Sequence, residues 1–441
     1  MTTHSGSLSL AHGTALYVGA VLGTGVIALP ALAADVAGPA SLLAWLLLVV
    51  ASAPLAATFA ALGARYPDAG GVSTYARLAF GDRAATVVGW CFFFAMPPGA
   101  SAAALFAGAY VEAAFGGGTT TIAGTGFAMV AVAGVTNAFG VRLSGRVQFG
   151  LASLLVVFLV TAVVLAVPHL SAANLRPFAP HGWLAIGPTA ALLVWSFVGW
   201  EAITHLTAEF RRPARDLPRA TAAAVVVVGV LYLAVAFAVI GVLGPAAGTS
   251  AAPLGEVLAV GLGGNARVLA AAAAVLLTFG VVNTYFAGAA KLGAALGRDG
   301  ALPSWLASGS RAGEVPRRSL GVLLAGVVVT LVVVLAAGIG PHLLVSVTSG
   351  LFVTVYAVGV AAAVKLLPTG GRPWLTAVLA LGIVVMLTAL TGRYLLWAAL
   401  VTAGALLSAH LRRRGRPDSD ELLQTGTGGI ADATGGPAHR G

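Results

Sequence analysis

Long apolar stretches, separated by short polar breaks, follow one another along almost the whole of the 441-residue chain. Residues 84–111 form a stretch of 28 without a charged side chain, and residues 220–244 form another of 25. A helix of roughly 20 apolar residues is long enough to cross a bilayer. The pattern therefore predicts an all-α integral membrane protein with many spans.

Charged residues and clusters of Pro and Gly divide the chain into about twelve predicted spans. Their expected ranges are 12–33, 39–63, 84–111, 119–138, 147–168, 185–208, 219–244, 267–290, 319–338, 342–365, 374–391 and 393–411. We assign the apolar segment 245–265 as a loop. Residues 1–11 carry no Lys or Arg, so we expect the first span to be retained and not to be a cleaved signal peptide.

Basic residues are distributed unevenly between the two ends of these spans. If the N-terminus is cytoplasmic, 21 of the 24 Lys and Arg residues fall in cytoplasmic connections or in the C-terminal tail. Arg176, Arg267 and Arg393 are then the basic residues left outside. The positive-inside rule describes this skew, so we expect both termini to be cytoplasmic.

Composition excludes several classes of protein. The chain is 59% hydrophobic and 9% charged, whereas soluble chains carry roughly 25% charged residues. Its net charge of +10 follows from the cytoplasmic connections and does not indicate a nucleic-acid partner. Cys91 is the single cysteine, so neither an intrachain disulfide nor a cysteine metal site is expected. We expect no cofactor, no metal site and no enzymatic activity.

Two predicted spans contain glycines in mid-membrane, where an interrupted helix can line a binding site. The first contains Gly23 and Gly25, and the sixth contains Gly199. A broken helix exposes N–H groups that suit a carboxylate and carbonyl groups that suit an ammonium or a cation. A zwitterionic amino acid fits both ends. Alternatively, the glycines allow close helix packing.

Four motifs then carry a resemblance to the amino acid–polyamine–organocation superfamily. They are residues 23–26 (GTGV), 66–72 (YPDAGGV), 197–202 (FVGWEA) and 209–220 (EFRRPARDLPRA). Residues 22–33 and the pair Pro97-Pro98 are also similar to the bacterial exporters of methionine and branched-chain amino acids. The motifs cover residues 12–220, and the remainder matches mainly in hydropathy.

The resemblance implies a LeuT-like fold, with five plus five spans as inverted repeats and two additional spans. A single transporter domain would cover residues 1–411, with repeat one at 12–168, repeat two at 185–365 and the extra spans at 374–411. Residues 412–441 would form a disordered cytoplasmic tail.

The resemblance also implies a substrate site between the two discontinuous helices. Backbone near the first break would hold the carboxylate, carbonyls near the second would hold the amine, and apolar side chains on spans 3, 6, 8 and 10 would select the substrate. The aromatic members have an alternative interpretation as packing residues or residues facing lipid. The candidates are Leu22, Gly23, Thr24, Gly25, Val26, Met96, Gly99, Trp195, Ser196, Phe197, Val198, Gly199, Trp200 and Tyr285.

Glu201 is the one acidic residue predicted inside a span, and His205 follows one helical turn later. An intramembrane carboxylate is a functional hypothesis, so the pair are candidates for proton coupling. A structural role, in which Glu201 caps the broken backbone, is the alternative. Sodium is a weaker candidate ion, with possible ligands at Thr278, Asn283 and Thr284 on span 8.

These observations predict a secondary active transporter of neutral hydrophobic amino acids such as methionine, leucine, isoleucine and valine. Export coupled to protons, in a bacterial inner membrane, is the favoured form. Uptake or exchange by the same superfamily is an alternative, and a membrane amino-acid sensor is an alternative of another class. The sequence does not specify an oligomeric state. The lipid bilayer and an amino acid are the expected partners.

Overall fold

The computed structural model describes residues 10–23, 25–66, 71–140, 145–201, 213–310 and 314–414. These residues form helices, short 3-10 turns and connecting loops, with no strand among them. In the first part of the chain the helices are α1 (Leu10–Leu22), α2 (Gly25–Ala37), α3 (Ser41–Arg65), α4 (Val72–Phe80), α5 (Asp82–Phe115), α6 (Gly118–Ala138) and α7 (Gly145–Ala166). They continue with α8 (Ile186–Leu193), α9 (Pro213–Leu243), α10 (Pro253–Leu262), α11 (Ala266–Arg298), α12 (Arg317–Ala336), α13 (Pro341–Leu366), α14 (Arg372–Thr391) and α15 (Leu395–Arg414).

Among the described residues, nine helical segments are long and apolar enough to cross a membrane. Two of them, Gly25–Arg65 and Arg372–Leu411, contain 41 and 40 residues and each include two helices joined by a short 3-10 turn. The apolar helices Gly13–Leu22 and Trp183–Ser196 are too short to cross alone. The chain is therefore an all-helical, multi-pass membrane protein, and the count of twelve spans stays a prediction.

The segment 245–265 corrects our assignment of a loop. It contains a 3-10 helix at Gly244–Thr249 followed by helix α10. Leu254 and Val257 are fully buried, and α10 packs against α7, α9 and α11. A helix of ten residues is too short to give the apolar period that distinguishes a membrane span, so its tertiary contacts decide its structure.

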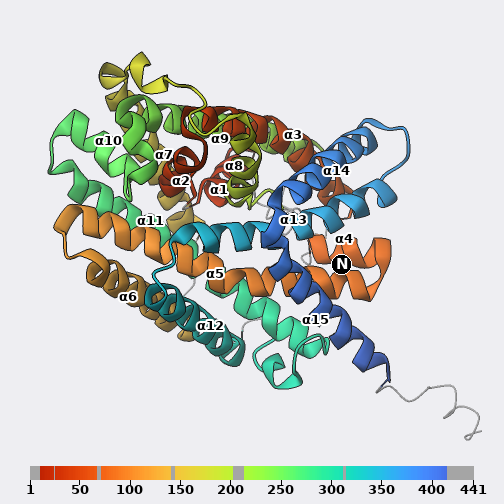
Figure 1. The fold of residues 1–441 in the computed structure, drawn as a ribbon. Helices are drawn as coiled ribbons and strands as arrows, with labels where there is room; N and C mark the ends of the chain where they lie inside the picture. Colours follow the sequence, from red (N-terminus) through yellow and green to blue (C-terminus); the bar gives the residue numbers. More distant parts are fainter. Residues whose placement is uncertain are drawn as a thin grey trace, which may run out of the picture.

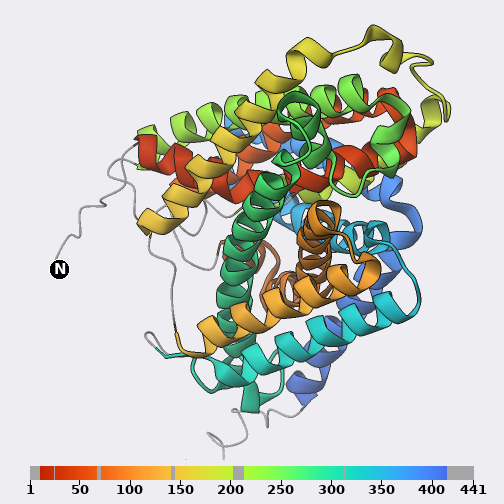
Figure 2. The same ribbon diagram turned by 90° about the vertical axis from the view of Figure 1, so that its left-hand side faces the viewer.

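The helices form two packed groups. Figure 1 shows α1, α2, α3, α8 and α9 together in one half of the molecule and α5, α6 and α12 in the other, with α13 between them. In the first group α9 packs on α1, α2 and α3, and α8 packs on α2 and α3; in the second, α5, α6 and α12 pack on one another. In Figure 2 the green α11 runs steeply past the orange and teal helices of the second group.

Helix α5 is the longest element, with 34 residues, and most of its surface is buried. It packs against α4, α6, α11, α12, α13 and α15. Pro97 and Pro98 lie inside it and each removes a backbone donor. Gly326 on α12 makes room for the first of these prolines, because a Cβ there would lie 3.1 Å from the Pro97 ring. Gly326 thereby lets α12 pack closely against the proline-containing segment of α5.

Candidate functional site

The first interruption separates α1 from α2. Helix α1 ends at Leu22, Gly23 has a φ of +33°, and α2 begins at Gly25. A positive φ is disfavoured for residues with a Cβ, so glycine permits the turn at this position. Thr24, a predicted substrate contact, lies outside the described residues.

The second interruption follows α8. After Leu193 the chain forms a 3-10 turn over Val194–Phe197, Val198 is extended, and Gly199 has a φ of +128°. Such a φ is accessible almost only to glycine. The predicted glycine breaks therefore occur at Gly23 and Gly199. Residues 202–212, which include His205, lie outside the described residues.

The two interruptions touch each other through their glycines. A Cβ on Gly199 would lie 2.8 Å from the carbonyl oxygen of Ala20 and 3.2 Å from the Cα of Val21. A Cβ on Gly25 would lie 3.2 Å from the Cα of Ser196. The backbones of α1, α2 and the turn after α8 thus approach as closely as glycine allows.

Buried tyrosines bond to carbonyl groups that the interruptions release. The Tyr232 hydroxyl lies 2.6 Å from the Ser196 carbonyl oxygen and 2.9 Å from that of Val21. The Tyr17 hydroxyl donates to the Trp200 carbonyl at 2.9 Å. Because a helix end leaves carbonyl groups unsatisfied, these hydroxyls stabilise the breaks in a setting without water.

Glu201 follows the second break directly and is 5% exposed. One of its carboxylate oxygens accepts hydrogen bonds from the Gly199 backbone N–H at 3.0 Å and from the Tyr356 hydroxyl of α13 at 2.8 Å. A buried carboxylate is costly unless it is hydrogen-bonded. Glu201 therefore joins the break to α13, which agrees with the structural role and leaves proton exchange open.

A cavity of about 680 Å³ opens beside the two breaks. Among the described residues that line it, the charged side chains are those of Glu201 and Lys291, and most others are apolar. It extends along α11 toward Lys291, and Ser73 of α4 lies on the same wall. Thr284, Gly288 and Lys291 are exposed, so the cavity reaches the surface at this end of the protein.

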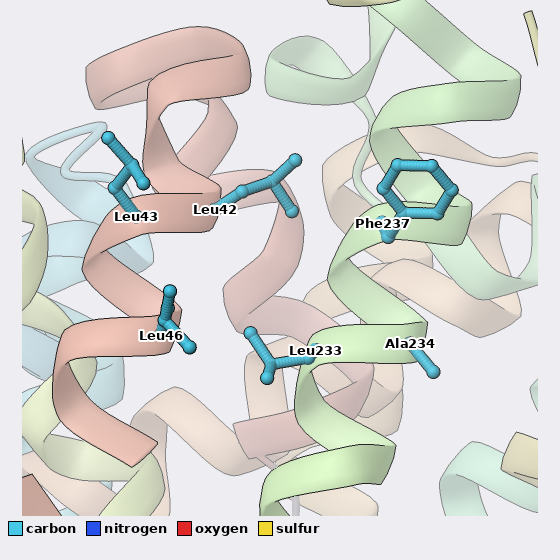
Figure 3. Close-up of a pocket in the computed structure, with 6 residues that line it drawn as sticks. All are labelled: Leu42, Leu43, Leu46, Leu233, Ala234 and Phe237. Carbon is cyan, nitrogen blue, oxygen red and sulfur yellow. The ribbon is translucent and has the colours of Figure 1, made fainter. Parts of the chain in front are cut away.

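A second hollow, of about 460 Å³, lies on the outer face between α3 and α9. Figure 3 shows Leu42, Leu43 and Leu46 of α3 opposite Leu233, Ala234 and Phe237 of α9. Every one of these side chains is apolar, so none can orient a charged or polar solute. A wholly apolar groove on the outside of membrane helices suits lipid chains, and we place the functional site in the larger cavity.

The structure brings many of the predicted site residues to this cavity. Predicted residues that line it are Gly23, Met96, Val198, Gly199, Glu201, Thr284 and Tyr285. Predicted residues that are described but do not line it are Leu22, Gly25, Val26, Gly99, Trp195, Ser196, Trp200, Thr278 and Asn283. The backbone of Phe197 belongs to the turn at the second break, and its side chain is outside the described part.

Two predicted aromatic contacts lie behind the cavity wall. Trp200 is fully buried, and its ring centroid lies 5.2 Å from that of Tyr17 in an edge-on arrangement. Trp195 packs at 5.9 Å from the Phe106 ring. Both therefore pack the interior around the breaks, which for Trp200 is the alternative interpretation that the sequence left open.

Two of the three possible sodium ligands on α11, Asn283 and Thr284, bond to other protein groups. The Asn283 side-chain oxygen accepts hydrogen bonds from Thr136 and Asn137 of α6, both at 2.8 Å. The Thr284 hydroxyl donates to the Gly280 carbonyl of its own helix, and Thr284 lines the cavity. Asn283 is thus turned toward α6, away from the first break.

Several residues of the site were missed by the sequence reasoning. They are the cavity residues of α7 (Leu151, Ala152, Leu155), the apolar residues Phe92 and Phe352, and the tyrosines Tyr17, Tyr232 and Tyr356. The tyrosines did leave a signal, because a phenol hydroxyl inside a span needs an acceptor. The α7 residues gave no such signal in the sequence, because apolar side chains that line a cavity cannot be distinguished there from apolar side chains that face lipid.

The sequence is also similar to known membrane transport proteins, a finding that does not depend on the structure. Residues 8–402 match the family model described as amino acid permease. The chain is 32% identical to the uncharacterized amino acid permease YecA of Bacillus subtilis, over 90% of this chain and 94% of that protein.

Two further relatives carry names that state a substrate. The L-methionine/branched-chain amino acid exporter YjeH of Escherichia coli is 33% identical, over 91% of this chain and 95% of that protein. The branched-chain amino acid permease BcaP of Bacillus subtilis is 26% identical, over 52% of this chain and 53% of that protein. All three relatives are named as permeases or exporters, none as an enzyme.

Proposed function

The chain belongs to the amino acid permease family, and on that premise we propose that it is a secondary active transporter of neutral, hydrophobic amino acids. The observation that carries this proposal is the cavity beside the two touching helix breaks. Backbone groups at the ends of interrupted helices suit the charged ends of an amino acid. The apolar wall suits an uncharged side chain.

The composition of the wall favours a hydrophobic substrate side chain. Met96, Phe92 and Phe352 lie on one side of the cavity, and Leu151 and Leu155 lie on another. A dibasic substrate would need a second carboxylate partner to compensate its desolvated charge. Among the lining residues that the structure describes, Glu201 is the single acid, and it already accepts two hydrogen bonds.

Counterflow in proteoliposomes tests this proposal directly. Vesicles loaded with unlabelled methionine, leucine, isoleucine or valine are expected to accumulate the matching labelled amino acid, whereas lysine and glutamate are expected to give no accumulation. The absence of exchange for every neutral amino acid would overturn the substrate class. Specific binding of leucine without flux would favour a sensor instead of a transporter.

We propose the five plus five inverted repeat as the architecture behind the site. Matching helix contacts support it: α1 packs on α9 as α8 packs on α3, and α1 packs on α7 as α8 packs on α13. Two further contacts match in the same way: α5 packs on α13 as α11 packs on α7, and α6 packs on α11 as α12 packs on α5. Repeats at 12–168 and 185–365 would produce these equivalences.

For orientation, we propose that the arginine-rich ends of the helices face the cytoplasm, in a bacterial inner membrane. The cavity extends toward the end of α11, near Arg298, and toward α4. In this orientation it opens to the cytoplasm. Accessibility of a cysteine introduced at Gly288 to a membrane-impermeant thiol reagent, in inside-out but not right-side-out vesicles, is the expected result.

Export is the direction that we propose, because the relative from Escherichia coli with 33% identity is named as an exporter. Cells fed a methionine dipeptide release methionine internally, and expression of the chain is expected to lower their internal methionine. Uptake is the alternative, supported by the name of the branched-chain permease with 26% identity. A rise in internal methionine would favour that alternative.

We propose protons as the coupling ion, with Glu201 as the group that exchanges them. Its carboxylate joins the Gly199 backbone to the Tyr356 hydroxyl, so protonation would weaken a contact between the break and α13. His205, one turn later in the sequence, is the proposed second member. Sodium is less well supported, because Asn283 is bonded to α6.

Glu201→Gln tests this coupling in vesicles with an imposed pH gradient. The amide keeps the size of the side chain and cannot ionise. We expect gradient-driven accumulation to be lost while counterflow, which needs no gradient, persists. Retained accumulation under the gradient would assign Glu201 to the structural role alone.

A further inference from the structure

The hydroxyl of Tyr232 lies between the two helix breaks. Tyr232 is on α9 and is fully buried. Its oxygen is 2.6 Å from the Ser196 carbonyl oxygen, 2.9 Å from that of Val21 and 3.5 Å from that of Leu22. These acceptors come from residues 175 positions apart in the sequence, at the last turn of α1 and in the turn after α8.

More carbonyl oxygens lie within hydrogen-bonding distance of the Tyr232 hydroxyl than it has protons to donate. A phenol hydroxyl donates one hydrogen bond, whereas Val21 and Ser196 both present carbonyl oxygens within bonding distance. Both carbonyls belong to the C-terminal ends of interrupted helices, where the helix dipole is negative. A shared donor between them reduces their mutual repulsion and holds the two ends together.

The ring of Tyr232 is fixed by its surroundings. It stacks on Trp45 of α3 with ring centroids 4.9 Å apart and planes inclined by 27°. The helices α3 and α9 also pack directly against each other. Because the ring is held by a scaffold of two long helices, the hydroxyl has a defined position against which both breaks are set.

Tyr232 approaches the breaks from behind the cavity. The cavity residues opposite the breaks come from α5, α7, α11 and α13, and Tyr232 is not among the described residues that line it. The carbonyls of Val21 and Ser196 are therefore engaged on the α9 side, and neither residue lines the cavity. Val198, two residues after Ser196, does line it.

We propose that Tyr232 is a positioning residue that ties the two breaks together and determines which of their backbone groups face the substrate. The inference rests on the proposed transport function and refines it. Val21 and Ser196 belong to the scaffold, and the substrate ammonium group binds to backbone nearer Val198. Tyr232 acts through these backbone segments and does not touch the substrate.

The test compares Tyr232→Phe with Tyr110→Phe as a matched control. Tyr110 of α5 is equally buried; its hydroxyl donates to the Ile27 carbonyl in the first turn of α2 at 2.6 Å and accepts from the Leu254 N–H at 3.3 Å, so it bonds to only one side of one break and does not join the two. Each change removes one hydroxyl from a buried carbonyl, and Tyr110→Phe also removes the acceptor of the Leu254 N–H. In leucine counterflow, we expect Tyr232→Phe to raise KM at least tenfold with Vmax within twofold of the wild type. Tyr110→Phe is expected to lower the melting temperature similarly and to leave KM within twofold.

A conservative replacement separates positioning from folding. Replacing Tyr232 with 4-aminophenylalanine keeps the ring and supplies two N–H donors, one for each carbonyl. We expect this variant to fold and to have the KM of the wild type, even if Tyr232→Phe does not fold. A tenfold higher KM in the folded amino variant would overturn the inference.

The remaining outcomes distinguish the inference from the function on which it rests. A wild-type protein without counterflow for any neutral amino acid would overturn the proposed function and the inference with it. Active wild type together with an unchanged KM for folded Tyr232→Phe would overturn the inference alone. An equal rise of KM in Tyr110→Phe would do the same, because it would reveal a general effect of lost hydroxyls.

Discussion

Replacing Gly199 with alanine is the sharpest test of the contact between the two helix breaks. The residue has a φ of +128°, and its Cβ would lie 2.8 Å from the Ala20 carbonyl oxygen and 3.0 Å from the carbonyl carbon. Ordinary contacts of a Cβ begin near 3.4 Å. The added methyl group therefore forces α1 and the second break apart by about 0.6 Å.

Two costs combine at this position. A residue with a Cβ in a sparsely populated backbone region is destabilised by about 1 to 3 kcal/mol, and overpacking of a buried contact costs typically about 1 to 3 kcal/mol. Partial relaxation of the neighbouring backbone leaves a combined loss of stability of about 2 to 4 kcal/mol. The same displacement moves the backbone groups of both breaks, so we expect leucine binding to weaken by at least roughly 1.4 kcal/mol, which corresponds to a tenfold higher KM.

Leucine counterflow and thermal unfolding in detergent measure the two consequences of Gly199→Ala. Gly382→Ala is the matched control, because Gly382 lies inside α14 and a Cβ there would meet no atom within 4 Å. The control is expected to keep the KM and melting temperature of the wild type. If Gly199→Ala is folded and its KM stays within twofold of the wild type, the close approach of the breaks does not determine substrate binding.

Three further predictions concern other parts of the site. Tyr356→Phe removes a hydrogen bond to Glu201, so we expect the pH profile of gradient-driven transport to shift, and an unchanged profile would separate this contact from the proton step. Asn283→Ala removes a side-chain acceptor from Thr136 and Asn137 of α6, which keep their bonds to the Ala133 carbonyl; we expect a loss of about 1 kcal/mol in stability, seen as a lower melting temperature, with counterflow equally independent of sodium in variant and wild type. Met96→Trp places a larger side chain on the cavity wall and is expected to raise the KM for leucine several-fold more than that for alanine, whereas equal KM changes would place this wall outside the substrate site.

Much of the fold was predictable because membrane spans obey a simple physical rule. The predicted spans 119–138 and 342–365 correspond to α6 at Gly118–Ala138 and α13 at Pro341–Leu366. Apolar length and charged boundaries are local properties, so one sequence suffices to locate them. The resemblance to the superfamily is confirmed by the family match over residues 8–402. Helix α10 was missed because its structure depends on packing against α7, α9 and α11.

The site was predictable only where the backbone itself carries the signal. Gly23 and Gly199 have the positive φ values that mid-span glycines suggested, and Glu201 is buried beside the second break. The direction of side chains was not predictable, because helix rotation depends on neighbouring helices. Trp200 therefore packs on Tyr17, although its place in the motif suggested the cavity wall.

The need to satisfy backbone groups without water explains why several tyrosines contact the breaks. Inside a bilayer, a broken helix must satisfy its carbonyl groups without water, and a tyrosine brings a hydroxyl to them on a largely apolar ring. The Tyr17 hydroxyl bonds to a carbonyl at the second break, and the Tyr232 hydroxyl lies within bonding distance of carbonyls at both breaks. Tyr356 of α13 donates a hydrogen bond to Glu201. Glycines allow the broken backbones to meet, and tyrosines fix how they meet. A chain with few charged residues can thus build a polar site from backbone groups, and the selectivity for uncharged side chains that we propose would follow from the apolar residues around it.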